Sequence, residues 1–144
     1  MNVQVNQPGG DKEVDATEKR FHDLLRQKAH VFITTISSDG APHTTMTWVD
    51  TDGEHALINV PAGTVKSRNI ARDPRVSLAI ADPESPRHYF TGRGSVVATD
   101  PDADMQHFSQ LAMKYLGKPV SALGGPVHQR FIHTIHLDVI REQG

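Results

Sequence analysis

The residues with the clearest chemical potential lie in one short stretch, residues 64–75, with the sequence TVKSRNIARDPR. The stretch predicts a short helix capped by Thr64, and the first turn of a helix has free N–H groups and partial positive charge. Lys66 and Arg68 are unfavourable there in isolation, by about a few tenths of a kcal/mol each. A phosphate reverses this balance, because the amides, the Thr64 and Ser67 hydroxyls and the Lys66 ammonium can converge on one anion. The pattern indicates a phosphate site, and the alternative of equal weight is a solvated helix whose cations lie over the neighbouring surface.

Other familiar sites are excluded by residue type or spacing. The chain has no cysteine, so it has no disulfide, thiolate nucleophile, iron–sulfur cluster or Cys-ligated zinc. Gly92 and Gly94 begin a dinucleotide-binding fingerprint, but Val97 occupies the position of its third glycine. His133 and His136 are three apart on a predicted strand, so they project from opposite faces and cannot easily share a metal ion. We predict no metal site, no catalytic nucleophile and no acid–base pair.

Size and charge indicate one globular domain. The 144 residues are 37% hydrophobic and 22% charged, which is enough to build a core and unlike a disordered tail. The formal net charge of -2 argues against a surface dedicated to nucleic acid or anionic lipid. Residues 1–14 are predicted to be a flexible leader and residues 15–144 the domain. The sequence shows neither a secretory signal pattern nor an apolar run near the ~18 residues of a membrane span, so we expect a cytoplasmic protein.

Hydrophobic periodicity predicts the elements that position the residue 64–75 stretch. Asp15 and Glu18 form a capping box ahead of a helix over residues 16–28. A period of two then predicts three consecutive antiparallel strands, joined by tight turns at two Asp-Gly steps. Later elements are listed in chain order: strands 75–82 and 87–99, the second bent at its glycines, a helix opening at Asp100-Pro101, and a strand over 131–140. These elements predict an α+β, mainly β fold, a six-stranded antiparallel barrel with flanking helices.

The order of these motifs resembles a known superfamily. A strand ending in Asp-Gly is followed by APHTTMTWV, by ALINVP and then by T-x-K-S-R-N-I-A-R-D-P-R-V-S-L-A-I. This order is similar to that of the flavin-binding split-barrel proteins around pyridoxamine 5'-phosphate oxidase, and within them to the small coenzyme F-420-dependent reductases. The resemblance covers residues 16–140 and implies a six-stranded antiparallel split β-barrel that forms a homodimer, with each cofactor at the subunit interface. We expect apolar surface around Trp48 and Met46 that the second copy covers.

The resemblance also implies the residues of the cofactor site. The residues implied near the phosphate are Lys66, Thr64, Ser67, Arg68 and Asn69. Those implied along the ring are His43, Thr44, Thr45, Met46 and Thr47, and those beside the ribityl chain are Asn59 and Val60. Those implied near the partner subunit or before the last strand are Tyr89, Phe90 and Arg130.

The activity implied by the resemblance is hydride transfer between the deazaflavin coenzyme F-420 and a small planar or conjugated organic substrate. The absence of a candidate nucleophile agrees with this, because a bound ring performs the redox step while the protein supplies binding and orientation. Alternatives on the same fold are an FMN-dependent oxidase or reductase and a non-catalytic flavin or deazaflavin carrier. Pyridoxamine phosphate oxidation is disfavoured, because those enzymes carry a C-terminal extension with Trp and Arg residues, whereas this sequence ends at Gly144. Haem degradation is disfavoured because it usually needs a further domain.

The surplus arginines of the residue 64–75 stretch bear on the choice of cofactor. F-420 continues beyond its phosphate into an anionic oligoglutamate tail, whereas FMN ends at one phosphate. Arg68, Arg72 and Arg75 could form a screened basic track for that tail. The alternative is that these arginines pair with Asp73 and other surface carboxylates. A nucleic-acid-binding barrel using the same cations is a further alternative, but it lacks interleaved exposed aromatic residues.

Overall fold

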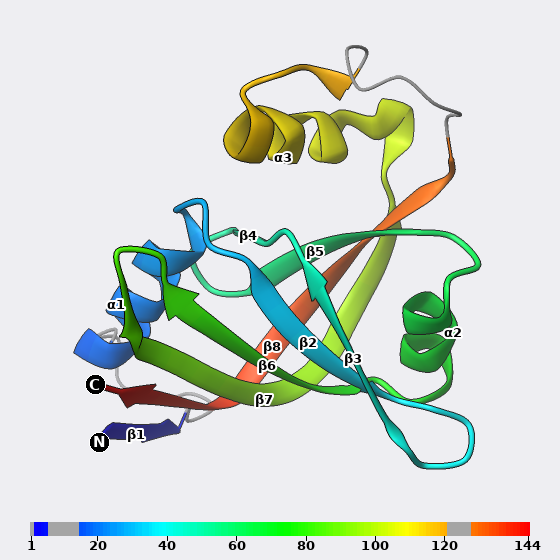
Figure 1. The fold of residues 1–144 in the computed structure, drawn as a ribbon. Coiled ribbons are helices and arrows are strands. Elements are labelled where there is room, and N and C mark those ends of the chain that lie inside the picture. Colours follow the sequence, from blue (N-terminus) through cyan, green and yellow to red (C-terminus); the bar gives the residue numbers. More distant parts are fainter. Residues whose placement is uncertain (1, 6–14, 121–127) are drawn as a thin grey trace.

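The computed structural model describes residues 2–5, 15–120 and 128–144, which form one curved sheet with three helices around it (Figure 1). The elements in chain order are β1 (Asn2–Val5), α1 (Ala16–Leu25), β2 (Val31–Ile36), β3 (Pro42–Thr47), β4 (Asp50–Thr51), β5 (Ala56–Pro61), α2 (Val65–Arg72), β6 (Arg75–Asp82), β7 (Ser85–Pro101), a 3-10 turn (Ala103–Met105), α3 (Gln106–Leu116) and β8 (Arg130–Gln143). None of the described helices has the length and apolar character needed to cross a membrane.

The strands form one antiparallel sheet in the order β3-β2-β6-β7-β8-β5-β4, with β1 paired to β8. β3 lies at one edge and the β4–β5 pair at the other, so the barrel is split between β3 and β5. The predicted fold is confirmed, because β2, β3, β5, β6, β7 and β8 correspond to the predicted strands and β1 and β4 are short additions. β1 lies within residues 1–14, so part of the segment predicted to be a leader pairs with the sheet.

The two Asp-Gly turns have different consequences. Gly40, with a φ of +86°, closes the β2–β3 hairpin as predicted. The second turn, at Gly53, joins β5 only to the two-residue strand β4. After Thr47 the chain turns toward α3, where the N–H of the buried Val49 donates to the Tyr115 hydroxyl. The expectation of three consecutive hairpin strands is therefore wrong at the second turn, and β3 and β5 lie at opposite edges.

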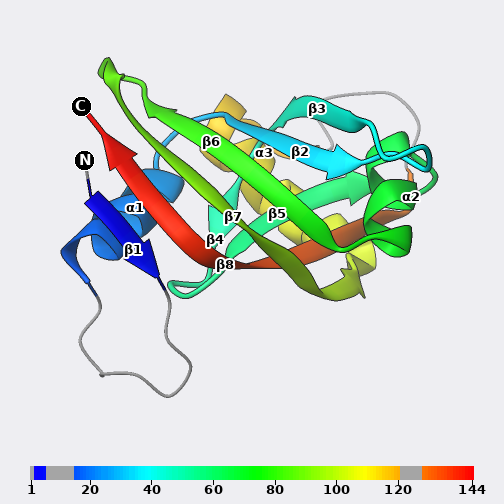
Figure 2. The same cartoon turned by 90° about the horizontal axis from the view of Figure 1, so that it is seen from below.

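Helices α1 and α2 cover the two ends of the barrel (Figures 1 and 2). α1 begins at the predicted cap, where the Asp15 carboxylate accepts from the Thr17 N–H at 2.8 Å, and it ends at Leu25, earlier than predicted. Phe21 and Leu25 are fully buried in the core, and Ile70 of α2 enters the same core from the other end. The helix that carries the predicted phosphate site is thereby anchored to the barrel.

The helix after β7 begins later than the sequence predicts. Asp100-Pro101 does not open it, because both residues continue β7 and pair with β8. The chain then passes through Asp104 and Met105, whose φ values of 57° and 54° are left-handed, before α3 starts at Gln106. The Asp102 carboxylate instead accepts hydrogen bonds from backbone N–H groups in the first turn of α3.

Gly94 marks the predicted bend in β7. The register of β7 on β8 shifts between Arg93 and Gly94, which is a β-bulge. A Cβ atom at Gly94 would lie 1.8 Å from the His136 carbonyl oxygen, so a side chain there cannot be accommodated without moving the backbone. The close approach keeps β7 and β8 side by side as they curl around the barrel (Figure 2).

Candidate functional site

A groove of about 300 Å³ opens between β3, β5, the start of β8 and α3. Its lining residues come from these elements and from the segments next to them. They are His30, Met46, Thr47, Trp48, Asn59, Phe108, Leu111 and Arg130. The structure therefore brings together predicted site residues that are distant in the sequence, namely Met46, Thr47, Asn59 and Arg130.

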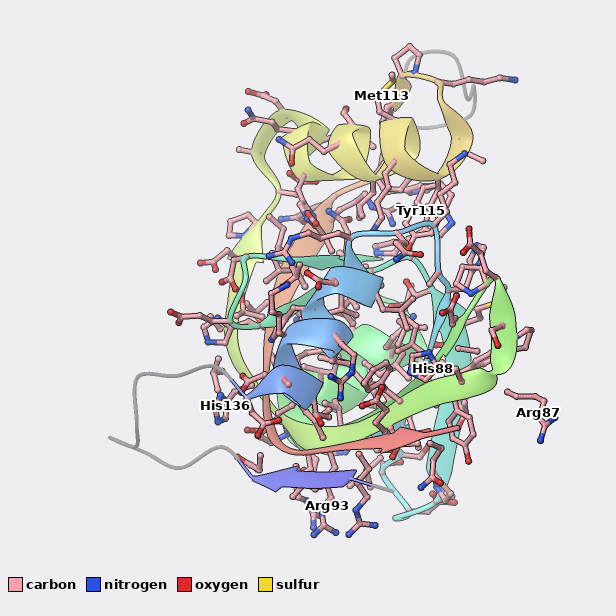
Figure 3. The ribbon with its side chains drawn as sticks, turned by 90° about the vertical axis from the view of Figure 1, so that its left-hand side faces the viewer. Arg87, His88, Arg93, Met113, Tyr115 and His136 are labelled. Carbon is pink, nitrogen blue, oxygen red and sulfur yellow. The ribbon has the colours of Figure 1, made fainter. Side chains whose placement is uncertain are left out.

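α3 gives the groove an aromatic wall that is missing from the predicted site. The Trp48 ring stacks on Tyr115, with ring centres 5.1 Å apart, and on Phe108 at 5.9 Å. The Tyr115 hydroxyl donates to the Ala29 carbonyl oxygen and accepts from the Val49 N–H, so it fixes α3 over the strands (Figure 3). Trp48 is thus partly covered by the chain's own helix, and the covering of the surface around Trp48 and Met46 by a second copy stays a prediction. Phe108 and Tyr115 are seven residues apart on one helical face, and this spacing is the sequence signal for the wall.

Arg130 is the cation that lines the groove. Its Nε–H donates to Asn59 Oδ1 at 2.5 Å, and Nη2 donates to the Asn59 backbone carbonyl at 3.3 Å. The guanidinium carbon lies 3.7 Å from the centre of the Phe108 ring, in a cation–π contact. Burial lowers the pKa of Arg130 from its ordinary value. Nη1 has no hydrogen-bond partner among the described residues, and such a free edge suits a phosphate or carboxylate oxygen.

Asn59 connects Arg130 to a buried polar network under α3. Its Nδ2 donates to Asp102 Oδ2 at 2.9 Å and to His107 Nδ1 at 3.0 Å. The other ring nitrogen of His107 lies 3.2 Å from Asp50 Oδ2. Within residues 2–5, 15–120 and 128–144, no group of three or more His, Asp or Glu residues is arranged to hold a metal ion. The hydrogen bonds of the network join side chains of distant elements.

Lys66, in the first turn of α2, has no hydrogen-bond or ion-pair partner in the described part of the chain. Burial lowers the pKa of Lys66, and the nearby Arg130 charge lowers it further. Burial also lowers the pKa of His133 to about 4, and the Lys66 charge contributes to that shift. His133 is 2% exposed, and its Nε2 has no partner among the described residues. An ammonium near a second cation and without a carboxylate partner favours an anion beside it.

Other predicted phosphate ligands are engaged by the chain itself. Thr64 caps α2, because its Oγ1 accepts from the Ser67 N–H at 3.2 Å and donates to the Pro61 carbonyl. Arg68 is exposed and donates to the Gly63 carbonyl at 2.5 Å. The Ser67 side chain remains half-buried near the start of the helix. Of the predicted ligands in this turn, Lys66 is thus the cation with no bond to residues that the structure describes.

Asn69 and Arg72 fasten the last turn of α2 to β2. Asn69 is buried, and its Nδ2 donates to Thr35 Oγ1 at 3.0 Å. Arg72 Nη2 donates to Asn69 Oδ1 at 2.8 Å and to the Ile36 carbonyl at 2.9 Å. These bonds give both residues a structural role in docking the helix.

Arg75 pairs with Asp73, which is the alternative to a basic track considered for the surplus arginines. Its Nη2 lies 2.8 Å from Asp73 Oδ2 in an exposed ion pair. The hydrogen bond from Arg75 lowers the pKa of Asp73 to about 2. The predicted basic track is therefore largely bonded to the chain's own groups.

The predicted ring-lining strand β3 has two faces. His43, Thr45 and Thr47 stand opposite buried residues of β2 and face the barrel, whereas Thr44 and Met46 face outward. Met46 and Thr47 reach the groove, and Thr44 lines a separate hollow on the outer face. The Thr45 hydroxyl is buried without a hydrogen-bond partner in the described residues. The strand therefore presents one unsatisfied hydroxyl on its inner face, near the split.

Two predicted residues belong to the core. Val60 is 2% exposed, and Phe90 is fully buried with its ring centre 5.7 Å from that of Phe21. Their side chains pack in the core and are not among those that line the groove, because inward positions of β5 and β7 are used for packing, and their place at a cofactor stays a prediction. Tyr89, the neighbour of Phe90, is 39% exposed and pairs with Ala81 of β6. Its contact with a partner subunit stays a prediction.

Comparison with known proteins identifies the fold and the family. Among solved structures, an F420 reductase is 25% identical with a TM-score of 0.75, over 83% of this chain and 94% of that one. A conserved hypothetical protein from Mycobacterium tuberculosis is 20% identical with a TM-score of 0.68, over 92% and 88%. An FMN-binding protein from Nostoc punctiforme, related to pyridoxamine 5'-phosphate oxidase, is 12% identical with a TM-score of 0.63, over 90% and 84%. No curated protein matches the chain. The family model described as pyridoxamine 5'-phosphate oxidase matches residues 17–143. Because this match runs from α1 to the end of β8, the chain belongs to the pyridoxamine 5'-phosphate oxidase family.

Proposed function

We propose that this protein is an oxidoreductase that uses the deazaflavin coenzyme F420 to transfer a hydride to or from a small organic substrate. The observation that carries the proposal is Lys66, which lies near Arg130 and has no partner among the described residues. A phosphate is the anion that this cation and the first turn of α2 are suited to bind. The similarity to an F420 reductase supports the deazaflavin as the phosphate-bearing cofactor.

The groove fits a flat ring attached to that phosphate. Trp48, Phe108 and Leu111 offer apolar and aromatic surface on one side. β3 is an edge strand, so its outer N–H and C=O groups can bond to polar atoms of a ring, and the buried Thr45 hydroxyl needs a partner. When bound, the deazaflavin supplies the hydride chemistry, while the residues of this chain bind it, orient it and exclude water from one face.

FMN is the second candidate, and the engaged arginines favour it. A basic track for an oligoglutamate tail needs cations that are free to move toward it, but Arg72 and Arg75 are bonded to their own chain. Arg68 is exposed at the open end of the helix, and its guanidinium donates to the Gly63 carbonyl at 2.5 Å, so it too has a bond within the chain. A single phosphate needs fewer cations than the tail, so the choice depends on measured affinities.

Parallel titrations of the protein with F420 and FMN test the proposal. We expect F420 to bind more tightly, with an affinity that rises with tail length and falls with salt. Arg68→Ala should flatten both dependences, and Arg72→Ala should flatten them less because its guanidinium is bonded to β2. Oxidation of the reduced cofactor by an electron acceptor at a protein-dependent rate distinguishes an enzyme from a carrier. Tighter binding of FMN, with no effect of tail length, would move the assignment to FMN.

We also propose that the protein is a homodimer with the cofactor site at its interface. Phe32 and Met46 are paired neighbours on the outer face of the sheet, 51% and 56% exposed. A hollow of about 380 Å³ continues from Phe32 to Val139 and Arg141, and Arg93 projects from the same side of the sheet (Figure 3). Exposed apolar surface of this kind is suited to a second copy.

Light scattering of the parent and a Phe32→Glu variant tests the assembly. The parent should have twice the chain mass of 15.8 kDa, and the variant should shift toward that single-chain mass because a carboxylate would be buried between copies. Arg87→Glu, at an exposed position of β7, is the matched control. A cofactor-loaded parent with the mass of one chain would exclude a shared site.

A further inference from the structure

We propose that Asp102 is a positioning residue: through Asn59, it holds the guanidinium of Arg130 so that the free Nη1 edge binds an anionic group of the ligand in the groove. The identity of that ligand rests on the proposed function, whereas the arrangement of the three residues does not. Nothing in the residue 64–75 stretch indicates this role, because Asp102 lies between β7 and α3 and is far from that stretch in sequence.

The argument begins with the orientation of the Asn59 amide. An amide has a donor end and an acceptor end, and its direction is set by the groups around it. The Asp102 carboxylate can only accept, and it lies 2.9 Å from Asn59 Nδ2. His107 Nδ1 takes the second Nδ2 hydrogen at 3.0 Å. With both hydrogens committed on the buried side, the Asn59 oxygen must point the other way.

Arg130 requires the Asn59 oxygen to point toward it. A guanidinium has donors only, and its Nε–H meets Asn59 Oδ1 at 2.5 Å. If the amide turned over, Nδ2 would face Nε–H, and two donors would meet in a site where Asn59 is 5% exposed. A buried donor without an acceptor costs more than the bond itself contributes. The carboxylate of Asp102 therefore determines, through Asn59, where the guanidinium of Arg130 can lie.

The same carboxylate also sets the surface under the guanidinium. Asp102 accepts from the backbone N–H groups of His107 and Phe108, each at 2.9 Å, so it fixes the first turn of α3. Phe108 then lies 3.7 Å beneath the Arg130 guanidinium. The guanidinium is held along one edge by Asn59 and on one face by Phe108, which leaves Nη1 free among the described residues. A cation held in this way loses little rotamer freedom when an anion binds.

Titration of FMN and F420 into a set of variants tests this role. Asp102→Asn leaves one amide oxygen for three donors, Asn59 Nδ2 and the N–H groups of His107 and Phe108, so Asn59 is no longer held by an acceptor-only group and we expect about tenfold weaker binding. Asp104→Asn is the matched control, because it removes the same charge two residues away, at an exposed position whose left-handed φ asparagine tolerates. In an Arg130→Ala background, Asp102→Asn should have almost no further effect. Effects that simply add would show that Asp102 acts on the fold rather than through Arg130.

A charge-exchanged double variant separates positioning from a general loss of stability. Asn59→Asp combined with Asp102→Asn places a donor at position 102 opposite an acceptor at position 59 and keeps an acceptor facing Arg130, at unchanged net charge, with His107 Nδ1 becoming the donor to residue 59. We expect it to recover the position of Arg130 but only part of the affinity lost in Asp102→Asn, because the new carboxylate pairs with the guanidinium. Riboflavin, which lacks the phosphate of FMN, identifies the group that Arg130 binds. Arg130→Ala should weaken FMN more than riboflavin, and equal weakening would overturn the anionic assignment.

A measurement without ligand keeps this inference distinct from the proposed function. The Arg130 Nε–H signal in a nitrogen-correlated NMR spectrum, identified by its loss in Arg130→Ala, should exchange slowly in the parent and in Asp104→Asn. It should exchange rapidly in Asp102→Asn and recover in the double variant. Persistence of the signal in Asp102→Asn would overturn the positioning role, even in a protein that binds neither cofactor. Failure of both cofactors to bind, with the NMR pattern as expected, would reject the proposed function and the anion-binding part of this inference, and leave the positioning of Arg130 established.

Discussion

The first and last turns of α2 carry similar side chains but have different roles in the structure. Lys66 in the first turn has no partner among the described residues, and a second cation lies near it. Asn69 and Arg72 in the last turn are bonded to β2, and Arg72 is also bonded to Asn69. A cation that already has partners gains little from a ligand, whereas one without partners gains a charge-assisted bond. The comparison shows that the availability of a charge, more than its presence in a motif, indicates a binding site.

Lys66→Ala should have the largest effect on binding. Loss of the unpartnered ammonium removes a charge-assisted contact of about 1.5–3 kcal/mol, so cofactor affinity should fall about tenfold to a hundredfold. The free energy of unfolding should change little, because Lys66 has no bond within the described chain. Fluorescence titration and urea denaturation measure the two quantities, with the exposed Lys28→Ala as control. Unaltered affinity in Lys66→Ala would mean that the first turn is only a solvated helix end.

Asn69→Ala should have the opposite profile. It leaves the buried Thr35 hydroxyl and one Arg72 donor without their partner, so the free energy of unfolding should fall by about 1–3 kcal/mol. Cofactor affinity, measured well below the unfolding transition, should stay close to that of the parent. If binding weakens while urea denaturation is unchanged, Asn69 belongs with Lys66 and the contrast between the two turns is lost.

The pKa of His133 reports on the charge at the first turn. Burial and the Lys66 charge lower it to about 4, so folded His133 stays neutral while an unfolded His133 binds a proton below its ordinary value of 6.5. The contribution of this group to stability is therefore present above pH 6.5 and is lost as the pH falls from 6.5 to about 4. Lys66→Ala should raise the pKa of His133, as measured by NMR titration of its ring proton. An unchanged value would show that the two side chains are electrostatically independent.

The smallest effect is expected at the ion pair beyond the last turn. Arg75→Ala should raise the pKa of Asp73 from about 2 toward its ordinary value of 3.8. Any stability from this pair is present above pH 3.8 and is lost as the pH falls toward 2, because the folded carboxyl has the depressed pKa. The pair is exposed, so denaturation at neutral pH should not distinguish the variant from the parent. NMR titration of the Asp73 carboxyl measures the shift, and a pKa that stays near 2 would assign it to another neighbour.

The sequence predicts most of the fold because periodicity and turn chemistry are local. The β2–β3 hairpin at Gly40, the bulge at Gly94 and the cap at Asp15 each follow from a few neighbouring residues. The separation of β3 from β5 does not, because a period of two indicates a strand but not its partner. The real start of α3 also escapes prediction, since Asp100-Pro101 is a good helix opening that pairing with β8 overrides.

The candidate site is less predictable than the fold. The motif indicates Lys66, yet nothing in the sequence shows that Lys66 lacks a partner among the described residues while Arg72 and Arg75 are bonded to other groups of the chain. Asn59 and Arg130 enter the prediction by resemblance, but their connection to Asp102 depends on three elements meeting in space. Partnerships between distant side chains are set by tertiary packing, and a single sequence does not contain their distances.

β8 has a consequence for how the molecule assembles. It pairs with β7 along most of its length, with β5 through contacts such as Ile58 with His133, and with β1 from the start of the chain. Contacts between residues so far apart in sequence form only after large loops close, and the conformational entropy lost on closing these loops slows folding. Before β8 docks, the edges of β5 and β7 are unpaired and can join other chains instead. We therefore expect truncation or destabilisation of β8 to increase aggregation during refolding. Cofactor binding by the molecules that do fold should be less affected.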